Sequence, residues 1–226
     1  MLALKLGLSL NTIHPYGEWV PDGDANLVAW YANKRGITAP TGNVSVWADS
    51  SGNGYTMRNV TLTEQPLYVA GTGALGFDPA KTQNLQSSSQ ISLSGEFTIG
   101  IRLNPSAVNI TVLADNTTSG EFIKIQTSSR MRIKIDNTQA DIDLNSGSFG
   151  DDYLVITRNS SNVITLYRNG TAQTDTETLS GTADIDNIGV RSTDQNPYSG
   201  QIREIQIYDK EDSVLTTNVN NYLANL

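Results

Sequence analysis

Short runs in which apolar and polar residues alternate recur along most of the chain. In residues 97–103, every second residue is Phe, Ile or Leu, and Thr, Gly and Arg lie between them. Alternation with a period of two predicts a β-strand with one buried face. The same pattern predicts further strands at 122–126, 131–135 and 142–144.

A hairpin is predicted where two such runs are separated by a short polar turn. Residues 153–158 and 163–168 alternate in this way, and Asn-Ser-Ser-Asn joins them at 159–162. Asn169-Gly170 then supplies a second turn, because this dipeptide suits a tight hairpin. Strands spaced about 8 to 12 residues apart with such turns predict a β-sandwich or barrel.

The first ten residues form a separate alternating run, in which five leucines share one face of a predicted strand: Leu2, Leu4, Leu6, Leu8 and Leu10. Two interpretations stay open. The run is an outer strand of the domain's own sheet, or it is an arm that extends a neighbour's sheet. Residues 11–26 are rich in Pro, Gly and aromatic residues and are predicted to be an irregular connector. We therefore expect an arm and connector at 1–26 and one domain at 27–226.

One helix is predicted at the C-terminus. Asp212 or Ser213 is a suitable N-cap. The apolar residues that follow fall on one side of a helix: Leu215, Val219, Tyr222, Leu223 and Leu226. We expect this side to pack on the sandwich.

Composition narrows the range of partners. The net charge of -8 and pI near 4.5 oppose binding to nucleic acid and to anionic membranes, since both need a basic surface. There is no cysteine, so neither disulfides nor thiolate metal sites are expected. No secretory signal or long apolar run is recognised, which predicts synthesis in a host cytoplasm and release by other means.

Six phrases, taken in order, resemble the laminin G-like branch of the concanavalin A-like lectin/glucanase superfamily. They are LVAWY at 27–31, WADSSGNG at 47–54, GALGFD at 73–78, EFTI at 96–99, ITLYRNG at 164–170 and GQIREIQIYD at 200–209. The resemblance implies an all-β fold: a two-sheet antiparallel jelly-roll sandwich, here with an N-terminal strand-like arm and a short C-terminal helix. The sequence departs from the family at 79–81 and 151–155, so ligand sites that depend on those positions are not carried over.

A second resemblance concerns the N-terminus. The order of segments at the N-terminus is similar to that of virion structural proteins of tailed phages, particularly those of marine cyanobacteria. The segments are a short leucine/glycine start, a connector, Trp19-Val20-Pro21 and then Leu27 to Tyr31. This resemblance implies a place in a virion, with synthesis in the host and release by lysis.

A calcium loop is one interpretation of residues 49–54. Asp49, Ser51 and Asn53 place oxygen atoms at alternate positions and a glycine follows, but Val60 occupies the place of the bidentate Glu of an EF-hand. The other interpretation is an Asx-type turn between strands, without a metal. No other cofactor is expected.

Catalytic residues are not expected. The only histidine, His14, lies in the connector, and no Glu begins the paired-carboxylate pattern of the glycosidases of this fold. Asp141 and Asp143 share one face of an ordinary strand. The acidic residues are otherwise expected mainly in solvated turns, at Asp22, Asp24, Asp115, Asp151, Asp194 and Asp212. A glycine-rich match to a dinucleotide motif at 71–76 lacks the helix that such a site needs. We therefore expect no facing carboxylate pair on the concave sheet face.

Aromatic residues fall into two groups. Trp30 and Trp47 lie within apolar patterns and are predicted to be buried in the core. Tyr16, Trp19 and Tyr198 lie in loop-like surroundings, where each either packs on the domain's own edge or stacks on a sugar or a partner protein.

Together these patterns predict a non-catalytic phage virion structural protein, a capsid decoration or surface appendage. Its arm would hold it to a major capsid or appendage protein in multiple copies, and its lectin-like domain would face outward. The alternative is a carbohydrate-binding lectin or host-recognition module that binds a surface glycan. The fold by itself does not decide between them.

Overall fold

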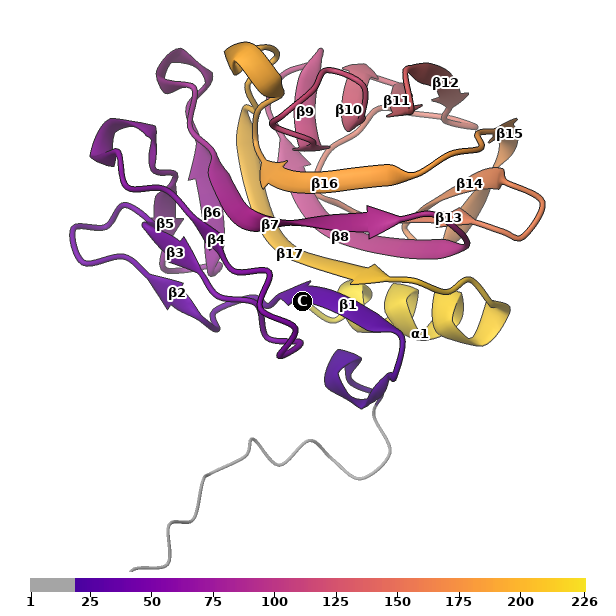
Figure 1. Cartoon of the computed structure of the whole chain (residues 1–226), viewed down its shortest axis with the longest axis horizontal. Coiled ribbons are helices and arrows are strands. Elements are labelled where there is room, and N and C mark those ends of the chain that lie inside the picture. The colour runs from indigo at the N-terminus through magenta and orange to yellow at the C-terminus, as the bar shows by residue number, and fades with distance from the viewer. Residues whose placement is uncertain (1–18) are drawn as a thin grey trace, which may run out of the picture.

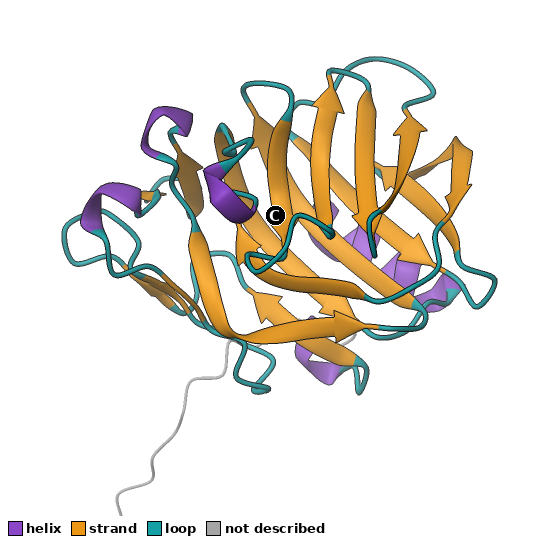
Figure 2. Ribbon diagram, turned by 45° about the horizontal axis from the view of Figure 1, so that its top comes forward, coloured by secondary structure: helices purple, strands orange, loops and turns teal. Residues whose placement is uncertain are grey.

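The chain is a β-sandwich in a computed structural model that describes residues 19–226. Two antiparallel sheets lie face to face, and one helix lies outside them (Figure 1; Figure 2). This arrangement confirms the predicted all-β jelly roll with a C-terminal helix. The predicted leucine-rich arm lies outside the described residues. No helix in the described part of the chain is long and apolar enough to cross a bilayer.

The first sheet has eight strands in the described chain, seven in one path and β1 paired to β17. In spatial order, the strands are β15 (Thr171–Thr178), β14 (Val163–Arg168), β13 (Asp152–Arg158), β8 (Phe97–Pro105), β17 (Gly200–Tyr208), β6 (Ala74–Phe77) and β5 (Leu67–Val69), with β1 at Leu27–Tyr31.

The second sheet has nine strands among the described residues. In spatial order, they are β12 (Thr138–Asp143), β11 (Arg130–Ile135), β10 (Phe122–Thr127), β9 (Ile110–Ala114), β16 (Ala183–Ile188), β7 (Leu85–Leu93), β4 (Met57–Arg58), β3 (Val46–Trp47) and β2 (Ile37–Thr38). Short 3-10 turns lie in the connections: η1 (Pro21–Gly23), η2 (Leu62–Glu64), η3 (Pro79–Lys81) and η4 (Ser192–Asp194).

The main core fills the space between the sheets, because alternate residues of each strand point inward. On β8, Ile99, Ile101 and Leu103 are fully buried, as the alternation predicted. Trp47 is also buried and donates its Nε1 hydrogen to the Ala32 carbonyl at 3.1 Å. Trp30 is buried too, which confirms both tryptophan predictions.

The turns follow local sequence rules. Asn169 and Gly170 join β14 to β15 with φ of 51° and 79°, which is the left-handed backbone that a tight hairpin turn needs. Both predicted hairpin strands, β13 and β14, pair in register from Leu154↔Arg168 to Arg158↔Ile164. The glycine-rich segment 71–76 leads into strand β6 rather than a helix, so it is not a dinucleotide site.

Helix α1 (Ser213–Ala224) covers part of the outer face of the eight-stranded sheet. Asp212 caps it by accepting hydrogen bonds from the Val214 and Leu215 amides at 2.9 and 2.8 Å, as predicted. The helix buries Leu215, Val219 and Leu223 against residues of the sheet, which are Leu27, Trp30, Val155 and Tyr208. Figure 1 shows α1 beside β1 and β17, with β16 on the far side of the sandwich.

A buried polar network lies beneath this helix. The Glu204 carboxylate is fully buried and accepts hydrogen bonds from Trp30 Nε1 at 2.7 Å, the Asn33 amide at 2.9 Å and Gln206 Nε2 at 2.8 Å. Burial raises the pKa of Glu204 from its ordinary value, and the hydrogen bonds oppose that rise. The network therefore fastens β1 to β17 under the helix.

The outer face of the nine-stranded sheet has no helix on it among the described elements. Strand registers define one row of outward residues across this face, running from β4 to β11: Arg58, Gln86, Asn187, Ala114, Phe122 and Lys134. This row positions both sites described below.

Candidate functional site

An open groove of about 530 Å³ lies on the outer face of the nine-stranded sheet. Amide and hydroxyl side chains provide most of its walls: Asn59, Asn84, Gln86, Ser87, Ser88 and Asn116. The remaining lining residues are Arg58, Val60, Glu64 and Asp194. Val60 is 96% exposed and presents an apolar surface to solvent there.

Strand β7 supplies the floor of the groove. Gln86 pairs with Arg58 on β4 and with Asn187 on β16, so its side chain faces outward with theirs. Around this floor, the amides are held by their neighbours. Asn59 donates from Nδ2 to the Asn84 carbonyl at 3.1 Å, and Asn187 donates from Nδ2 to Asn116 Oδ1 at 3.2 Å. The groove is thus bordered by oriented hydrogen-bonding groups.

A buried carboxylate lies next to the groove. Asp186 is 5% exposed and accepts a hydrogen bond from the backbone N–H of Asn116 at 2.7 Å. Burial raises the pKa of Asp186, Asp115 adds to the rise, and hydrogen bonds from Asn116 and Gln86 oppose it. Asp186 therefore orients two groove residues from below.

The carboxylates that line the groove itself are Glu64 and Asp194, which lie on η2 and η4. Asp115 is buried rather than solvated, so the expectation that it lies in a solvated turn is wrong. Its carboxylate accepts hydrogen bonds from the Thr117 amide and hydroxyl, each at 2.7 Å. In residues 19–226, no group of three or more His, Cys, Asp and Glu side chains is placed to hold a metal.

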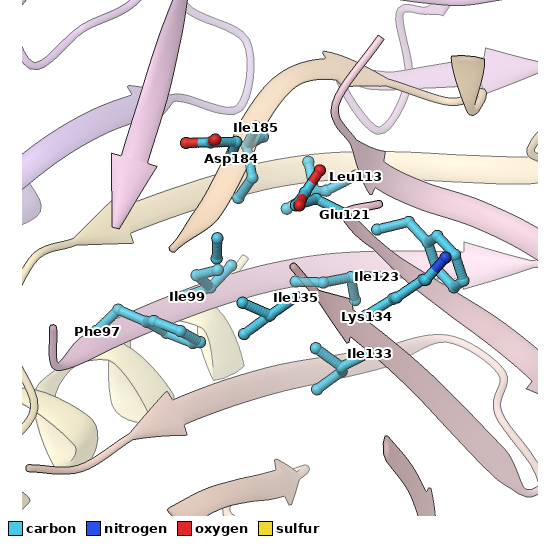
Figure 3. A pocket seen from close by; sticks show the side chains of 12 residues that line it. Phe97, Ile99, Leu113, Glu121, Ile123, Ile133, Lys134, Ile135, Asp184 and Ile185 are labelled. Atoms are coloured by element: carbon cyan, nitrogen blue, oxygen red, sulfur yellow. The ribbon is translucent and has the colours of Figure 1, made fainter. Parts of the chain in front are cut away.

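Two smaller hollows lie elsewhere in the sandwich. The cavity in Figure 3 has a volume of about 10 Å³ and lies among core side chains of the two sheets, including Phe97, Ile99 and Ile133. That volume holds at most one water molecule. A second hollow, of about 190 Å³, lies among Val108, Ile125 and Phe149 at one end of the sandwich.

The proposed calcium loop forms a tight turn that ties down β1. Both Asp49 carboxylate oxygens accept hydrogen bonds from the chain, one from the Trp30 and Ser51 amides and the other from the Ser51 hydroxyl and the Tyr55 amide. Asn53 turns its amide nitrogen to the Leu27 carbonyl at 2.9 Å. These contacts are those of an Asx-type turn, and calcium binding stays a prediction.

The three aromatic residues predicted as candidate ligand contacts lie in different surroundings. Tyr198 is fully buried and meets the Phe77 ring in a T-shaped contact, so it cannot stack on a sugar or a partner, and that proposed role is wrong. Trp19 packs against Tyr208 and Tyr222 at the edge of the helix. Tyr16 lies outside the described residues.

The predicted arm also lies outside the described residues, as does His14. Asp141 and Asp143 are on β12, where each forms a two-point ion pair with an arginine of β11, Arg132 and Arg130. Their role on this strand is therefore electrostatic pairing.

Sequence reasoning did not find the groove. Its residues come from 58–64, 84–88, 116 and 194, which the sheet order brings together. The one local signal was the Ser- and Gln-rich run of β7. Its polar residues alternate only partly with the buried residues Leu85, Ile91 and Leu93, since the pairing of β7 with β16 shifts in register along the strand.

Solved structures share this fold at low sequence identity. The binding domain of paraclostridial mosquitocidal protein 1 is 16% identical with a TM-score of 0.58, and the alignment covers 88% of this chain and 52% of that one. The binding domain of botulinum neurotoxin serotype C1 is 15% identical with a TM-score of 0.55, covering 92% and 53%. This chain therefore spans about half of these toxin domains.

A third similar structure is matched over almost its whole length. Domain 4 of AbnA, a GH43 extracellular arabinanase from Geobacillus stearothermophilus, was solved in complex with arabinotriose. It is 14% identical to this chain with a TM-score of 0.58, and the alignment covers 86% of this chain and 98% of that one. A comparison with curated protein sequences found no match.

The family model described as the concanavalin A-like lectin/glucanases superfamily, in its laminin G form, matches residues 78–215. This range contains strands of both sheets and is more than half of the 226 residues. The chain belongs to the concanavalin A-like lectin/glucanase superfamily.

Proposed function

We propose that this chain is a non-catalytic carbohydrate-binding domain whose ligand lies in the groove on the outer face of the nine-stranded sheet. The observation that carries the proposal is the lining of that groove, an open hollow of about 530 Å³ bordered by six amide and hydroxyl side chains. Amides and hydroxyls both donate and accept hydrogen bonds, as sugar hydroxyls do. Exposed Val60 offers the apolar surface on which the C–H face of a sugar ring packs.

The similar structures support a binding role. Two are binding domains of toxins, and a third, domain 4 of the arabinanase, was solved with arabinotriose. That third domain has nearly the length of this chain's sandwich, so a module of this size is sufficient to hold a short oligosaccharide.

The arrangement of carboxylates supports the non-catalytic part of the proposal. Glycoside hydrolysis needs two carboxyl groups that face each other across the scissile bond, one of them with a raised pKa. The groove-side acid with a raised pKa, Asp186, is almost fully buried and bonded to the main chain. It is thus withdrawn from any bound sugar.

A role in a virion is a finer proposal that rests on the sequence resemblance and on residues 1–10. If the leucine-rich arm anchors the domain in an assembly, deletion of Met1 to Leu10 removes the protein from assembled particles while the melting temperature of the domain is unchanged. Electron microscopy and sedimentation of particles assembled with full-length and truncated protein test this. Normal incorporation of the truncated chain contradicts it.

The groove is tested by filling it. Ser88 is exposed on β7 and lines the groove, so Ser88→Arg blocks the ligand with little strain on the fold. Thr176→Arg, at an exposed position of β15 on the other sheet, is the matched control. A glycan array identifies a ligand for the wild type, and calorimetry then measures its affinity for each variant.

We expect Ser88→Arg to weaken binding of that ligand at least about tenfold, which corresponds to about 1.4 kcal/mol, and Thr176→Arg to leave it unchanged. Equal affinity in both variants places the sugar elsewhere. Absence of binding to any glycan on the array, by folded wild-type protein, contradicts the proposed function.

A further inference from the structure

A cluster of cations surrounds one aromatic ring on the same outer face as the groove. The Arg191 guanidinium carbon lies 4.3 Å from the centre of the Phe122 ring, Lys124 Nζ lies 5.4 Å from it and Lys134 Nζ 5.9 Å. We call these four residues the Phe122 cluster. In a chain of net charge -8, three cations on one ring are a local reversal of charge.

The sheet registers explain why these residues meet. Phe122 on β10 lies opposite Lys134 on β11, and Lys124 lies opposite Arg132. The side chains of these two cross-strand pairs therefore face outward. Arg191 reaches the same ring from the segment after β16. Lys124 is only 5% exposed, whereas Lys134, Arg191 and Arg132 are half-buried and open to solvent.

Within the described part of the chain, none of the three cluster cations forms a salt bridge with a carboxylate. The nearby acid Asp141 is held by Arg132 at 2.6 Å. Each cluster cation instead donates to a neutral oxygen: Lys124 to Asn109 Oδ1, Lys134 to the Ser119 carbonyl and Arg191 to Asn196 Oδ1, at 3.0, 3.0 and 3.2 Å. Three positive charges are thus gathered without an anion in salt-bridge contact.

The environment makes this arrangement costly. Burial lowers the pKa of Lys124, the charges of Arg132 and Arg191 lower it further, and the charge of Asp141 opposes this fall. Three buried polar atoms of β9, β10 and the segment after β16 have no hydrogen-bond partner: Thr111 Oγ1, Gln126 Oε1 and Arg191 Nε. Thr111 lies directly opposite Lys124 and therefore faces the same side of the sheet. Both features are relieved if an anion binds here.

We propose that the Phe122 cluster is a subsite for the acid group of an acidic saccharide, a carboxylate or a sulfate, whose neutral part lies in the groove. This inference rests on the proposed function. Gln86 in the groove and Phe122 belong to one row and are separated by β16 and β9, a span of three strand spacings or about 14 Å. A short oligosaccharide is long enough to reach from one site to the other.

The chemistry of the cluster suits such a group. A guanidinium offers parallel donors to the two oxygens of a carboxylate or sulfate, and Arg191 has an unused Nε hydrogen. Lys134 supplies an ammonium near the same ring. The deeper Lys124 adds charge from below and acts as a positioning residue.

The test compares three probes: a neutral galactan oligosaccharide, an oligogalacturonate as the carboxylated probe and dextran sulfate as the sulfated one. The variants are Lys134→Gln, the double variant Lys134→Gln/Arg191→Gln, and Lys34→Gln/Lys81→Gln as a control with the same loss of charge at exposed residues. Circular dichroism and melting temperature show whether each variant folds. If the double variant does not fold, the single variant Lys134→Gln is used for the binding measurements.

We expect the acidic probes to bind the wild type at least about tenfold more tightly than the neutral probe at low salt, a preference that falls as salt screens the charges. The double variant loses that preference, Lys134→Arg keeps it and the remote control keeps it. Carboxylated and sulfated probes are distinguished by which one the double variant affects more.

Several outcomes overturn the inference. These are equal binding of acidic and neutral probes, an equal loss in the remote control, displacement of the saccharide by inorganic sulfate at equal concentration, or tighter binding of single-stranded DNA than of any saccharide. Its failure is distinguishable from failure of the proposed function: neutral sugar binding that Ser88→Arg removes supports the groove alone. Acidic binding that is insensitive to Ser88→Arg supports the cluster alone.

Discussion

The two outer faces of the sandwich are built in opposite ways. On the eight-stranded sheet, α1 covers an apolar cluster, and the buried Glu204 has hydrogen-bond donors from three neighbouring residues. On the nine-stranded sheet, the face carries an open, polar groove and a cation cluster, with buried polar atoms that have no hydrogen-bond partner. The chain itself covers the first face with a helix. In our proposal, a ligand covers the second face and pairs with its polar groups.

The contrast shows where stability and binding are separated in this fold. A covered face gains free energy from buried apolar area. An open face that carries unpaired donors and like charges gives up some of that stability, and such sites are commonly functional. Changes on the covered face should therefore alter unfolding, and changes on the open face should alter binding.

The largest expected effect is at Gly100, where the helix meets the sheet most closely. A Cβ atom at this position would lie 2.5 Å from Val219 Cγ1 and 3.1 Å from Leu223 Cδ1. Gly100→Val should therefore lower the free energy of unfolding by about 3 kcal/mol, measured by urea denaturation. Gly95→Val, where a Cβ meets nothing within 4 Å, is the control. Equal losses in both variants would mean that the helix is not closely packed.

The covered face was largely predictable from the sequence, and the open one was not. Period-two alternation marked β8, the Asn169-Gly170 dipeptide marked a hairpin, and Asp212 marked the start of α1, because each is a local rule. The groove and the Phe122 cluster depend on the sheet order, which places Arg191 beside a ring on β10. Tyr198 was misplaced because its polar neighbours in the sequence hide its contact with Phe77.

The turn at Asp49 should have the next largest effect, because it fixes β1 at the edge of the covered face. Asp49→Ala leaves the amides of Trp30, Ser51 and Tyr55 without their acceptor, and we expect a loss of about 2 kcal/mol in the free energy of unfolding. Asp22→Ala, at an exposed acid, is the control. Melting curves in millimolar calcium and in chelator should coincide for the wild type. A rise with calcium that Asp49→Ala abolishes would instead establish a calcium site.

The buried Glu204 should give the covered face a pH dependence. Because burial raises its pKa above the ordinary 4.5, its contribution to stability is fully present below that value and is lost as pH rises through the folded-state pKa. Glu204→Gln should cost about 1.5 kcal/mol near pH 4.5, since an amide cannot accept all the hydrogen bonds of the carboxyl group, and less at neutral pH. Denaturation from pH 4 to 8 checks this, and a cost that grows with pH would contradict it.

The smallest expected change in stability is on the open face, at the ion pairs of β11 and β12. Arg132 holds the Asp141 carboxylate by two hydrogen bonds and keeps the pKa of Asp141 below its ordinary value. Asp141→Asn should cost only about 0.5 kcal/mol of stability, because the pair is partly exposed to solvent. It also frees the charge of Arg132, which lies two register positions from Lys134 on the same face of β11, so affinity for oligogalacturonate should rise a few-fold.

Asp143→Asn is the matched control for this last change, because Asp143 also accepts two hydrogen bonds from an arginine, Arg130, but lies two positions farther along the two strands. If the Phe122 cluster is the anionic subsite, the gain in affinity is larger for Asp141→Asn than for Asp143→Asn and disappears at high salt. Equal gains in the two variants would show that the probe responds to the overall charge of the face rather than to this cluster. Calorimetry of both variants at two salt concentrations separates these outcomes, and it does so without disturbing the covered side of the sandwich.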